Sequence, residues 1–173
     1  MIFRNYKMIN LLKNTILTIL FIALATLETF AQSIPSVNLK NLYGTKINTA
    51  ELENDGKPIV ICFWATWCSP CKRELNNYMD YYADWQEETG VEIIAVSIDD
   101  TRSTKRVAPY ITSAGWEFEI LLDPAGDFKR AMGVINAPHT FLYNGEGVLV
   151  WSHNSYAEGD EEELYEELLK LVE

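Results

Sequence analysis

Cysteine is scarce in this chain, which contains only Cys62, Cys68 and Cys71 among its 173 residues. Two of them can form a disulfide, and the third must stay free or be buried. Because there is no second pair of cysteines, a metal-binding module built on several thiolates is disfavoured. The chemical information therefore lies mainly in the Cys-x-x-Cys motif formed by Cys68 and Cys71.

Positive charge is also in short supply. The chain has 14 Lys and Arg against 25 Asp and Glu, which gives a net charge of −11 at pH 7. So acidic a surface repels the phosphates of nucleic acids and of anionic lipids. The composition therefore predicts no nucleic-acid partner and no binding to an anionic membrane surface.

The chain lacks an apolar run of the 18 or so residues that suggest a membrane-spanning helix. The apolar run over 16–27 is shorter, follows Arg4, Lys7 and Lys13, and precedes small or compact residues up to Ala31. This arrangement is typical of a secretory signal peptide. We expect cleavage after Ala31 and a periplasmic or secreted protein. An uncleaved signal, which would be its only membrane contact, is the alternative.

Internal repeats and low-complexity linkers are absent as well. Without the expected signal peptide, residues 1–31, the remaining residues 32–173 fit one domain with a substantial core. The signal carries three basic side chains and one acidic one, so its removal takes the net charge to about −13. The residue directly after the expected cut is Gln32 and not a cysteine, so a lipid anchor is not indicated.

Apolar runs of strand length predict a buried sheet. Continuous runs indicate strands covered on both faces, and Asn144-Gly145 between two apolar segments predicts a hairpin. The predicted strands are 58–64, 91–98, 118–122, 140–143 and 148–151, with looser edge segments after Ser33.

Helical spacing of apolar residues separates these strands. Ser69 is a good helix cap, with Pro70 at the first helical position, where its missing N–H costs nothing. Pro109 should kink the next helix or delay its start. The predicted helices are 70–88, 103–114, 127–132 and 161–172, with one helical turn at 50–53. This order predicts an α/β fold, a central sheet with helices on both faces.

The Cys-x-x-Cys motif lies where a buried strand ends and a helix begins, in the stretch FWATWCSPCKRE. Cys68 falls at or just before the helix N-terminus, where unpaired N–H groups and the helix dipole stabilise an anion. The thiolate, which is the nucleophile, is therefore favoured at Cys68. Cys71 follows nearly one turn later and should be shielded. An exposed attacking thiol and a shielded resolving thiol suit thiol–disulfide exchange.

Two other interpretations of the motif stay open. Two thiolates suit Cu(I), with His139 as the candidate third ligand, as in a copper chaperone. A purely structural disulfide is the weakest alternative, because a bridge that closes so short a loop stabilises the fold little.

Two segments resemble a known family, the exported thiol–disulfide oxidoreductases of the TlpA/ResA type. FWATWCSPCKRE, residues 63–74, is similar to the family's active-site segment. GVINAPHTFLYNGEG, residues 133–147, is similar to its second landmark, a proline loop that leads into a hairpin. The resemblance covers about residues 34–173. It implies a thioredoxin-like fold with a mixed sheet and an extra helix and strand between the motif and Pro138.

The resemblance also implies which residues form the site. Cys68 and Cys71 are the expected catalytic pair, and Pro138 matches the family's cis-proline, which faces it. A cis bond there turns the backbone of Ala137 toward the cysteines, where an extended substrate segment can add as a strand. Trp67 matches the family's aromatic residue before the first cysteine and is expected to shield the disulfide and contact substrates.

One position departs from thioredoxin, which has a buried acid six residues before the first cysteine. Here this position is Cys62. A thiol is a poor proton carrier near neutral pH, so Cys62 is expected to be a small buried hydrophobic residue. Glu74 matches an acid that follows the motif in ResA-like proteins and is the candidate proton acceptor beside Cys71. A solvated surface charge is the alternative for Glu74.

The neighbouring residues receive lesser roles. Ser69 and Pro70 lie between the cysteines and are expected to tune the redox couple, with a sign that the sequence does not give. We expect His139 to point away along its strand, and Thr140 and Phe141 to hold the sheet and the proline loop.

The predicted function is that of an exported oxidoreductase that reduces disulfides of other periplasmic proteins, by family analogy including apocytochrome c. The Cys68–Cys71 dithiol–disulfide couple carries the electrons, so we expect no bound cofactor and no metal, and a membrane protein as electron donor. A thiol peroxidase of the peroxiredoxin type is the alternative, because those enzymes share the extra helix and strand. It is disfavoured because they usually present a lone reactive cysteine after Pro and Thr.

Overall fold

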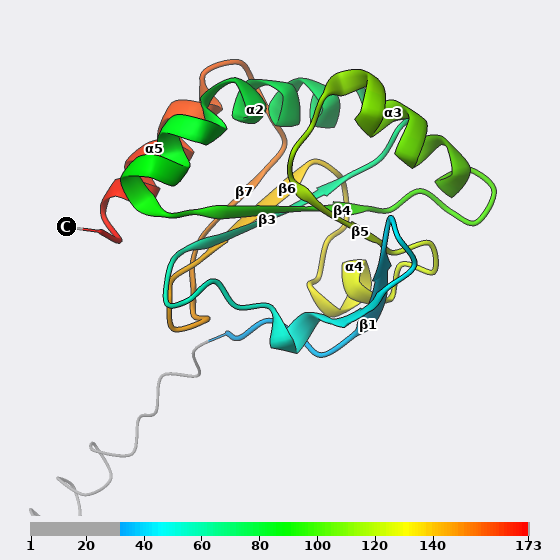
Figure 1. Cartoon of the computed structure of the whole chain (residues 1–173), viewed down its shortest axis with the longest axis horizontal. Helices are drawn as coiled ribbons and strands as arrows, with labels where there is room; N and C mark the ends of the chain where they lie inside the picture. Colours follow the sequence, from blue (N-terminus) through cyan, green and yellow to red (C-terminus); the bar gives the residue numbers. More distant parts are fainter. Residues whose placement is uncertain (1–31, 173) are drawn as a thin grey trace, which may run out of the picture. The chain divides into compact units, whose positions relative to one another are not determined.

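One mixed sheet organises residues 32–172, the part of the chain that the computed structural model describes (Figure 1). Its seven strands follow the order β2-β1-β5-β4-β3-β6-β7. The strands are β1 Asn38–Asn41, β2 Lys46–Asn48, β3 Ile59–Trp64, β4 Glu92–Ser97, β5 Glu119–Leu122, β6 His139–Tyr143 and β7 Leu149–Asn154. The predicted signal peptide, residues 1–31, lies outside the described residues.

Strand β3 is covered on both faces. It pairs with β4 in parallel and with β6 in antiparallel orientation, and all six of its residues are buried. Successive side chains of a strand point to opposite faces. Val60, Cys62 and Trp64 accordingly belong to one core cluster, and the alternate residues of β3 belong to the other. The continuous apolar run therefore predicted the environment of this strand correctly.

Helices cover both faces of the sheet, as the sequence predicts. They are α2 Ser69–Thr89, α3 Val107–Ala114, α4 Asp127–Ala131 and α5 Asp160–Leu169, with 3-10 turns η1 Thr49–Glu51 and η2 Thr104–Arg106. Helices α2, α3 and α5 lie on one side of the sheet and α4 on the other (Figure 1). The pair α3 and β5 is the extra helix and strand expected before Pro138. Among residues 32–172, no helix combines the length and apolar character that crossing a bilayer requires.

Three helix ends refine the predictions. The N-cap of α2 is Cys68 rather than Ser69, because its sulfur accepts the N–H of Cys71; Ser69 and Pro70 are the first two helical residues. Helix α5 ends before the predicted residue 172, because the last turn tightens into bonds between residues three apart. Helix α3 starts late, after η2, in agreement with the expected effect of Pro109.

The predicted hairpin between β6 and β7 is present, and its turn is closed by Asn144 and Gly147. The N–H of Asn144 donates to the carbonyl of Val148 (3.0 Å), and the N–H of Gly147 donates to the carbonyl of Asn144 (2.9 Å). The left-handed residue is Gly147, with φ 72°. Gly145 is needed for a different reason, since a Cβ there would overlap the backbone carbonyl of Gly56.

Replacing Gly145 by Ala should therefore destabilise the fold. The new Cβ meets backbone atoms of Gly56, which cannot rotate away as a flexible side chain does. We expect the free energy of unfolding to fall by about 1–3 kcal/mol, measured by urea denaturation. Glu146→Ala changes an exposed residue of the same turn and should cost less than about 0.5 kcal/mol. Equal losses in the two variants would contradict the close contact.

Candidate active site

Cys68 and Cys71 are joined by a disulfide where β3 ends and α2 begins. The backbone of Cys68 is extended (φ −88°, ψ 99°), and its Sγ accepts a hydrogen bond from the N–H of Cys71 (3.3 Å). The sulfur thus takes the place that a Ser or Asp oxygen usually holds at a helix N-cap. After reduction, this N–H and the positive end of the helix dipole favour the thiolate of Cys68.

Solvent reaches the two sulfurs unequally, but the difference is smaller than predicted. Cys68 is 4% exposed and Cys71 is 0% exposed. The expectation of an exposed first cysteine is therefore corrected, because the loop that carries Ala137 covers Cys68. Since Cys71 has no exposed surface in this oxidised form, attack from outside has a path to Cys68 alone.

The proline loop lies against the disulfide. The Ala137–Pro138 peptide bond is cis, as expected for Pro138, and the carbonyl oxygen of Ala137 lies 3.7 Å from the Sγ of Cys68. The N–H of Ser155 donates to the carbonyl of Pro138 (3.0 Å), which ties the loop to the residue after β7. The fold thus brings Ala137 beside the disulfide across a long stretch of sequence.

The buried side chain of Asp99 holds the loop that precedes the disulfide. Asp99 follows β4 and is 1% exposed. It accepts hydrogen bonds from the N–H (2.7 Å) and the hydroxyl (2.6 Å) of Thr66. These bonds position the backbone directly before Trp67, whose side chain is exposed. Asp99 was not among the predicted residues, although its place after the strand parallel to β3 could have indicated it.

Glu74 lies on α2 one turn after Cys71 and is 1% exposed, so the alternative of a solvated surface charge is wrong. Its Oε1 accepts hydrogen bonds from the hydroxyls of Thr140 (2.8 Å) and Tyr78 (3.2 Å). Its Oε2 is buried and has no hydrogen-bond partner within residues 32–172. Burial raises the pKa of Glu74 to about 8, and the two hydrogen bonds oppose this effect. The carboxyl group can therefore exchange a proton near neutral pH.

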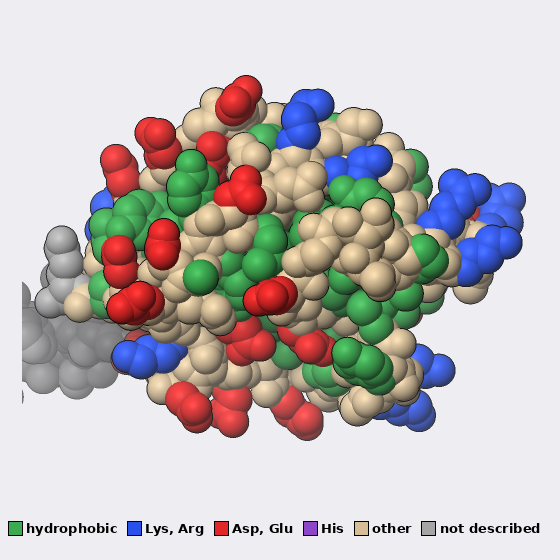
Figure 2. Space-filling model, turned by 45° about the horizontal axis from the view of Figure 1, so that its top comes forward, with side chains coloured by type: hydrophobic (Ala, Val, Ile, Leu, Met, Phe, Trp, Pro, Cys, Tyr) green, Lys and Arg blue, Asp and Glu red, His purple; other side chains and the backbone are tan. Residues whose placement is uncertain are grey.

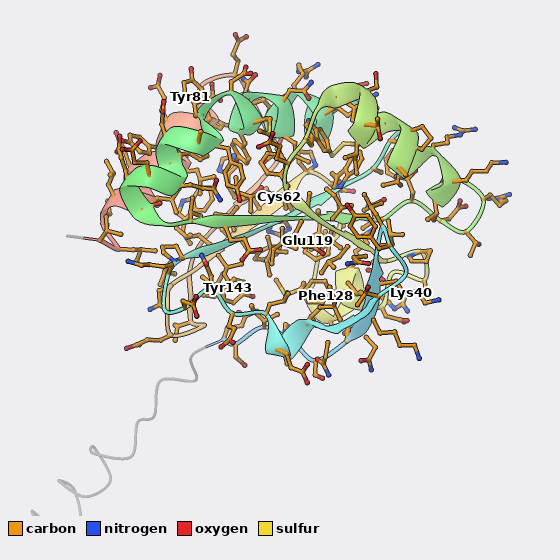
Figure 3. The ribbon with its side chains drawn as sticks, in the orientation of Figure 1. Lys40, Cys62, Tyr81, Glu119, Phe128 and Tyr143 are labelled. Atoms are coloured by element: carbon orange, nitrogen blue, oxygen red, sulfur yellow. A yellow bond between two sulfur atoms is a disulfide. The ribbon has the colours of Figure 1, made fainter. Side chains whose placement is uncertain are left out.

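Cys62 is the free cysteine and is fully buried, between the sheet and the helix layer that contains α2 (Figure 3). Its cross-strand partner is Thr140, whose hydroxyl oxygen lies 3.6 Å from its sulfur. Thr140 thus contacts both Cys62 and Glu74. Burial, and secondarily the charge of Glu74, raise the pKa of the Cys62 thiol well above its usual value. The predicted small buried residue is confirmed, and helix α2 supplies a buried acid, Glu74, that shares Thr140 with it.

Two of the lesser predictions can be placed in the structure. The ring of His139 stacks on Phe141, with centroids 4.2 Å apart, and Phe141 belongs to the core cluster on the α4 side. His139 therefore points away along the strand, as expected. Thr140 does more than hold the sheet, since it binds Glu74. Residues 32–172 contain no group of three or more His, Cys, Asp or Glu placed to hold a metal ion.

Replacing Glu74 by Gln should change how stability depends on pH. In the folded protein Glu74 keeps its proton up to about pH 8, whereas the unfolded chain ionises it near 4.5. Its contribution to wild-type stability is thus full below about pH 4.5 and is lost as the pH rises toward 8. Glu74→Gln cannot ionise and should remove this loss. The two oxidised proteins are compared by urea denaturation between about pH 4.5 and pH 8.5.

The difference in unfolding free energy between wild type and Glu74→Gln should change over this range by up to about 5 kcal/mol, since one pKa unit corresponds to about 1.4 kcal/mol. The control is Glu87→Gln, an exposed acid on the same helix, which should follow the wild type. Parallel pH profiles for wild type and Glu74→Gln would contradict a protonated, buried Glu74.

Comparisons with known proteins agree with this geometry. The AhpC/TSA family profile matches residues 30–152. The chain is 34% identical over 134 residues to thiol-disulfide oxidoreductase ResA from Halalkalibacterium halodurans, which covers 78% of this chain and 72% of ResA. It is 32% identical over 140 residues to thiol:disulfide interchange protein DsbE from Haemophilus influenzae, covering 80% and 72%.

A solved structure is similar over nearly its whole length. The solution structure of a thioredoxin-like protein from Porphyromonas gingivalis superposes with a TM-score of 0.74 at 50% identity, covering 84% of this chain and 94% of that chain. The thioredoxin-like fold predicted from the sequence is thus confirmed. The chain belongs to the AhpC/TSA family and, with its Cys68–Cys71 pair, to the ResA-like thiol–disulfide oxidoreductases within it.

Proposed function

We propose that this oxidoreductase works outside the cytoplasm as a reductant of disulfides in other proteins. The Cys68 thiolate attacks one sulfur of a partner's disulfide, forms a mixed disulfide and releases the partner's first thiolate. Cys71 then gives up its proton and attacks the Sγ of Cys68, which releases the partner's second thiolate. The partner has gained two electrons, and the enzyme is left with its Cys68–Cys71 disulfide.

The observation that carries this proposal is the hydrogen bond from the N–H of Cys71 to the Sγ of Cys68 at the start of α2. It favours negative charge on the sulfur of Cys68, which is also the one with some exposure. Negative charge and access on the same sulfur assign the attack to Cys68 and the resolving step to Cys71.

Glu74 is the proposed acceptor of the Cys71 proton. It lies one turn of α2 beyond Cys71. With a pKa of about 8, a minor fraction of Glu74 is ionised near neutral pH, and this ionised form can take up the proton. Thr140 and Tyr78 both bind Oε1, so Oε2 is the oxygen left for the proton. Burial excludes bulk water from this exchange.

Substrate binding is assigned to the surface around Cys68. An extended segment of the partner can pair with the backbone of Ala137, in the manner of an added strand. Trp67 is 62% exposed directly before Cys68 and offers an aromatic surface to the same segment. Ser69 and Pro70 remain the proposed tuners of the redox couple.

The cellular setting is proposed from the family and from the N-terminal sequence. Residues 1–31 would direct export to the periplasm, and family analogy points to cytochrome c maturation and redox homeostasis. The oxidised enzyme must be reduced again, for which we propose a membrane protein with a dithiol. The reduced Cys68–Cys71 dithiol holds both electrons, so the proposed cycle uses no bound cofactor.

A thiol peroxidase is the second candidate, because α3 and β5 supply the helix and strand that peroxiredoxins share. Measurement of hydrogen peroxide consumption by the reduced enzyme separates the two functions. Exchange with a disulfide peptide and negligible peroxide consumption support the oxidoreductase. Rapid peroxide consumption without exchange would support the peroxidase.

Serine substitutions should separate the roles of the two cysteines. Cys68→Ser removes the nucleophile and should lower the rate of peptide disulfide reduction by about 10³-fold or more. Cys71→Ser should accumulate a mixed disulfide through Cys68, because the resolving thiol is missing. Mass spectrometry under non-reducing conditions detects this adduct. Accumulation in Cys68→Ser instead would reverse the assignment.

The reduction potential of the full-length protein tests the direction of electron flow. The Cys68–Cys71 couple is equilibrated with dithiothreitol or glutathione and followed by tryptophan fluorescence. A potential below roughly −220 mV supports a reductant, and a potential nearer −120 mV would make the protein an oxidant. Absence of a reversible couple would overturn the oxidoreductase.

Cys62 should matter for stability and little for exchange. Cys62→Ser places a hydroxyl in a fully buried apolar site and should lower the free energy of unfolding by about 1–3 kcal/mol. The rate of disulfide exchange should stay within about twofold of wild type. Urea denaturation and the peptide reduction rate are measured on the same preparation, with Cys62→Ala as the control. Lost turnover in a folded Cys62→Ser protein would show that Cys62 takes part in the chemistry.

A further inference from the structure

Trp67 forms one wall of an open pocket of about 420 Å³ next to the disulfide. The other lining residues come from the segment between β4 and α3, and they are Ile98, Asp100, Arg102, Ser103 and Arg106. Because Trp67 directly precedes Cys68, a partner whose disulfide reaches Cys68 also meets this pocket.

The pocket carries net positive charge. Its one carboxylate, Asp100, already accepts hydrogen bonds from Ser103 (2.8 Å) and from Arg102 (3.1 Å), which lower its pKa to about 2. Arg106 and the adjacent Lys105 are exposed, and neither side chain forms an ion pair with the other residues of 32–172. These two cations are therefore available to a carboxylate from outside.

A second basic segment lies at the start of α2. Lys72 and Arg73 directly follow Cys71, and within the described part of the chain they also form no ion pair. The Nζ of Lys72 lies 5.4 Å from the ring centroid of Tyr110 in α3, which holds it toward the helix that follows η2. We call these five residues the basic rim: Lys72, Arg73, Arg102, Lys105 and Arg106.

The basic rim contrasts with the rest of the protein. It holds five of the 14 Lys and Arg residues of a chain with net charge −11. Of the acidic residues next to these cations, Glu74 and Asp99 are buried, and Asp100 is paired with Arg102. In Figure 2 most of the visible Lys and Arg side chains lie toward one end of the molecule, a few lie at the opposite end, and Asp and Glu side chains spread over the rest of the visible face.

The acidic side chains at the far end of α2 are too distant to cancel the electrostatic field of the basic rim. The acidic residues Asp84, Glu87 and Glu88 lie in the second half of α2, about 20 Å or more along the helix from its start. The first turn of α5 lies nearer, since the Oε1 of Glu161 is 3.5 Å from the Nδ2 of Asn77. The distance to the acids at the far end of α2 is more than twice the Debye length of about 8 Å at physiological ionic strength. A group docked beside Trp67 therefore senses the nearby cations more strongly than the distant carboxylates.

We infer that the pocket beside Trp67, together with the basic rim, binds acidic side chains of the substrate protein, so that the enzyme prefers disulfides flanked by Asp or Glu. This inference rests on the proposed function and names its substrate class. The guanidinium of Arg106 matches a carboxylate with two parallel N–H donors. The exposed ring of Trp67 packs against the apolar part of the same segment.

Three synthetic peptides test the inference. They share one Cys-x-x-Cys disulfide and differ only in the flanking residues, which are Glu, Gln or Lys. Each is reduced by the full-length, pre-reduced protein, and the rate constant is measured by mass spectrometry after acid quenching. At low ionic strength we expect the Glu peptide to react about fivefold faster than the Gln peptide, and the Lys peptide to react more slowly than both.

Salt and a matched pair of variants provide the controls. In about 0.5 M NaCl the ratio of the Glu to the Gln rate should fall toward one, because the contacts are exposed and screened. The variant Arg102→Glu/Lys105→Glu/Arg106→Glu should reverse the ratio. The variant Lys57→Glu/Lys129→Glu/Lys170→Glu makes the same change in net charge away from the rim and should keep the wild-type ratio.

The outcomes separate the inference from the proposed function. Equal rates for the Glu and Gln peptides, or the same ratio in both triple variants, would overturn the inference and leave the oxidoreductase intact. Failure to reduce any of the peptides would overturn both. The salt dependence of the Glu-to-Gln rate ratio is measured on the wild-type protein. It therefore tests the inference even if a triple variant does not fold.

Discussion

The site depends on the junction between a strand that is buried on both faces and the helix that follows it. Strand β3 lies between β4 and β6 and cannot move without disturbing both core clusters. Because α2 begins directly beyond it, Cys68 is held as the N-cap and Cys71 points into the first turn. Each neighbouring strand adds a part at the same edge of the sheet. Asp99 follows β4 and holds Thr66, and Pro138 precedes β6 and places Ala137 against the sulfur.

The buried carboxyl of Glu74 reaches the interior beside the Cys-x-x-Cys motif from helix α2 and not from strand β3. Strand β3 and helix α2 enclose the same interior space, so an acid can enter it from either element. Here Cys62 occupies the strand position and Glu74 enters from the helix, with Thr140 in contact with both. Burial costs stability once the carboxyl ionises, but the same burial raises its pKa to about 8. A buried group that lowers the stability of the protein but has a perturbed pKa is typical of a functional site.

Charge is distributed unevenly along this fold, and the disulfide lies at the basic end. Composition alone describes an acidic protein, and that average hides the five cations of the basic rim. Surface charges separated by more than a Debye length act almost independently in salt solution. Local charge around Trp67, rather than the net charge of the chain, therefore governs which partner segments are favoured at the site.

The amino-acid sequence by itself determined the elements, the layer order and the catalytic pair. Continuous apolar runs such as 58–64 need no partner to be recognised as buried strands, and the placement of Cys68 before a helix follows from local pattern and capping chemistry. Local pattern misassigned the cap of α2, and it could not show contacts between residues that are distant in sequence. The N-cap residue is Cys68 and not Ser69, because the sulfur of Cys68 accepts a hydrogen bond from the N–H of Cys71. Gly145 matters because Gly56, far away in sequence, lies against it.

Only the tertiary structure decided the environment of Glu74. Helical spacing leaves the face of residue 74 ambiguous, and its pKa is set by burial and by the hydroxyls of Tyr78 and Thr140, the latter more than sixty positions away. The contact of Asp99 with Thr66 likewise needs two parallel strands to end side by side. Sequence pattern determines what each segment becomes, because that depends on neighbouring residues. Electrostatic environment depends on which segments meet, and that is known only when the chain has folded.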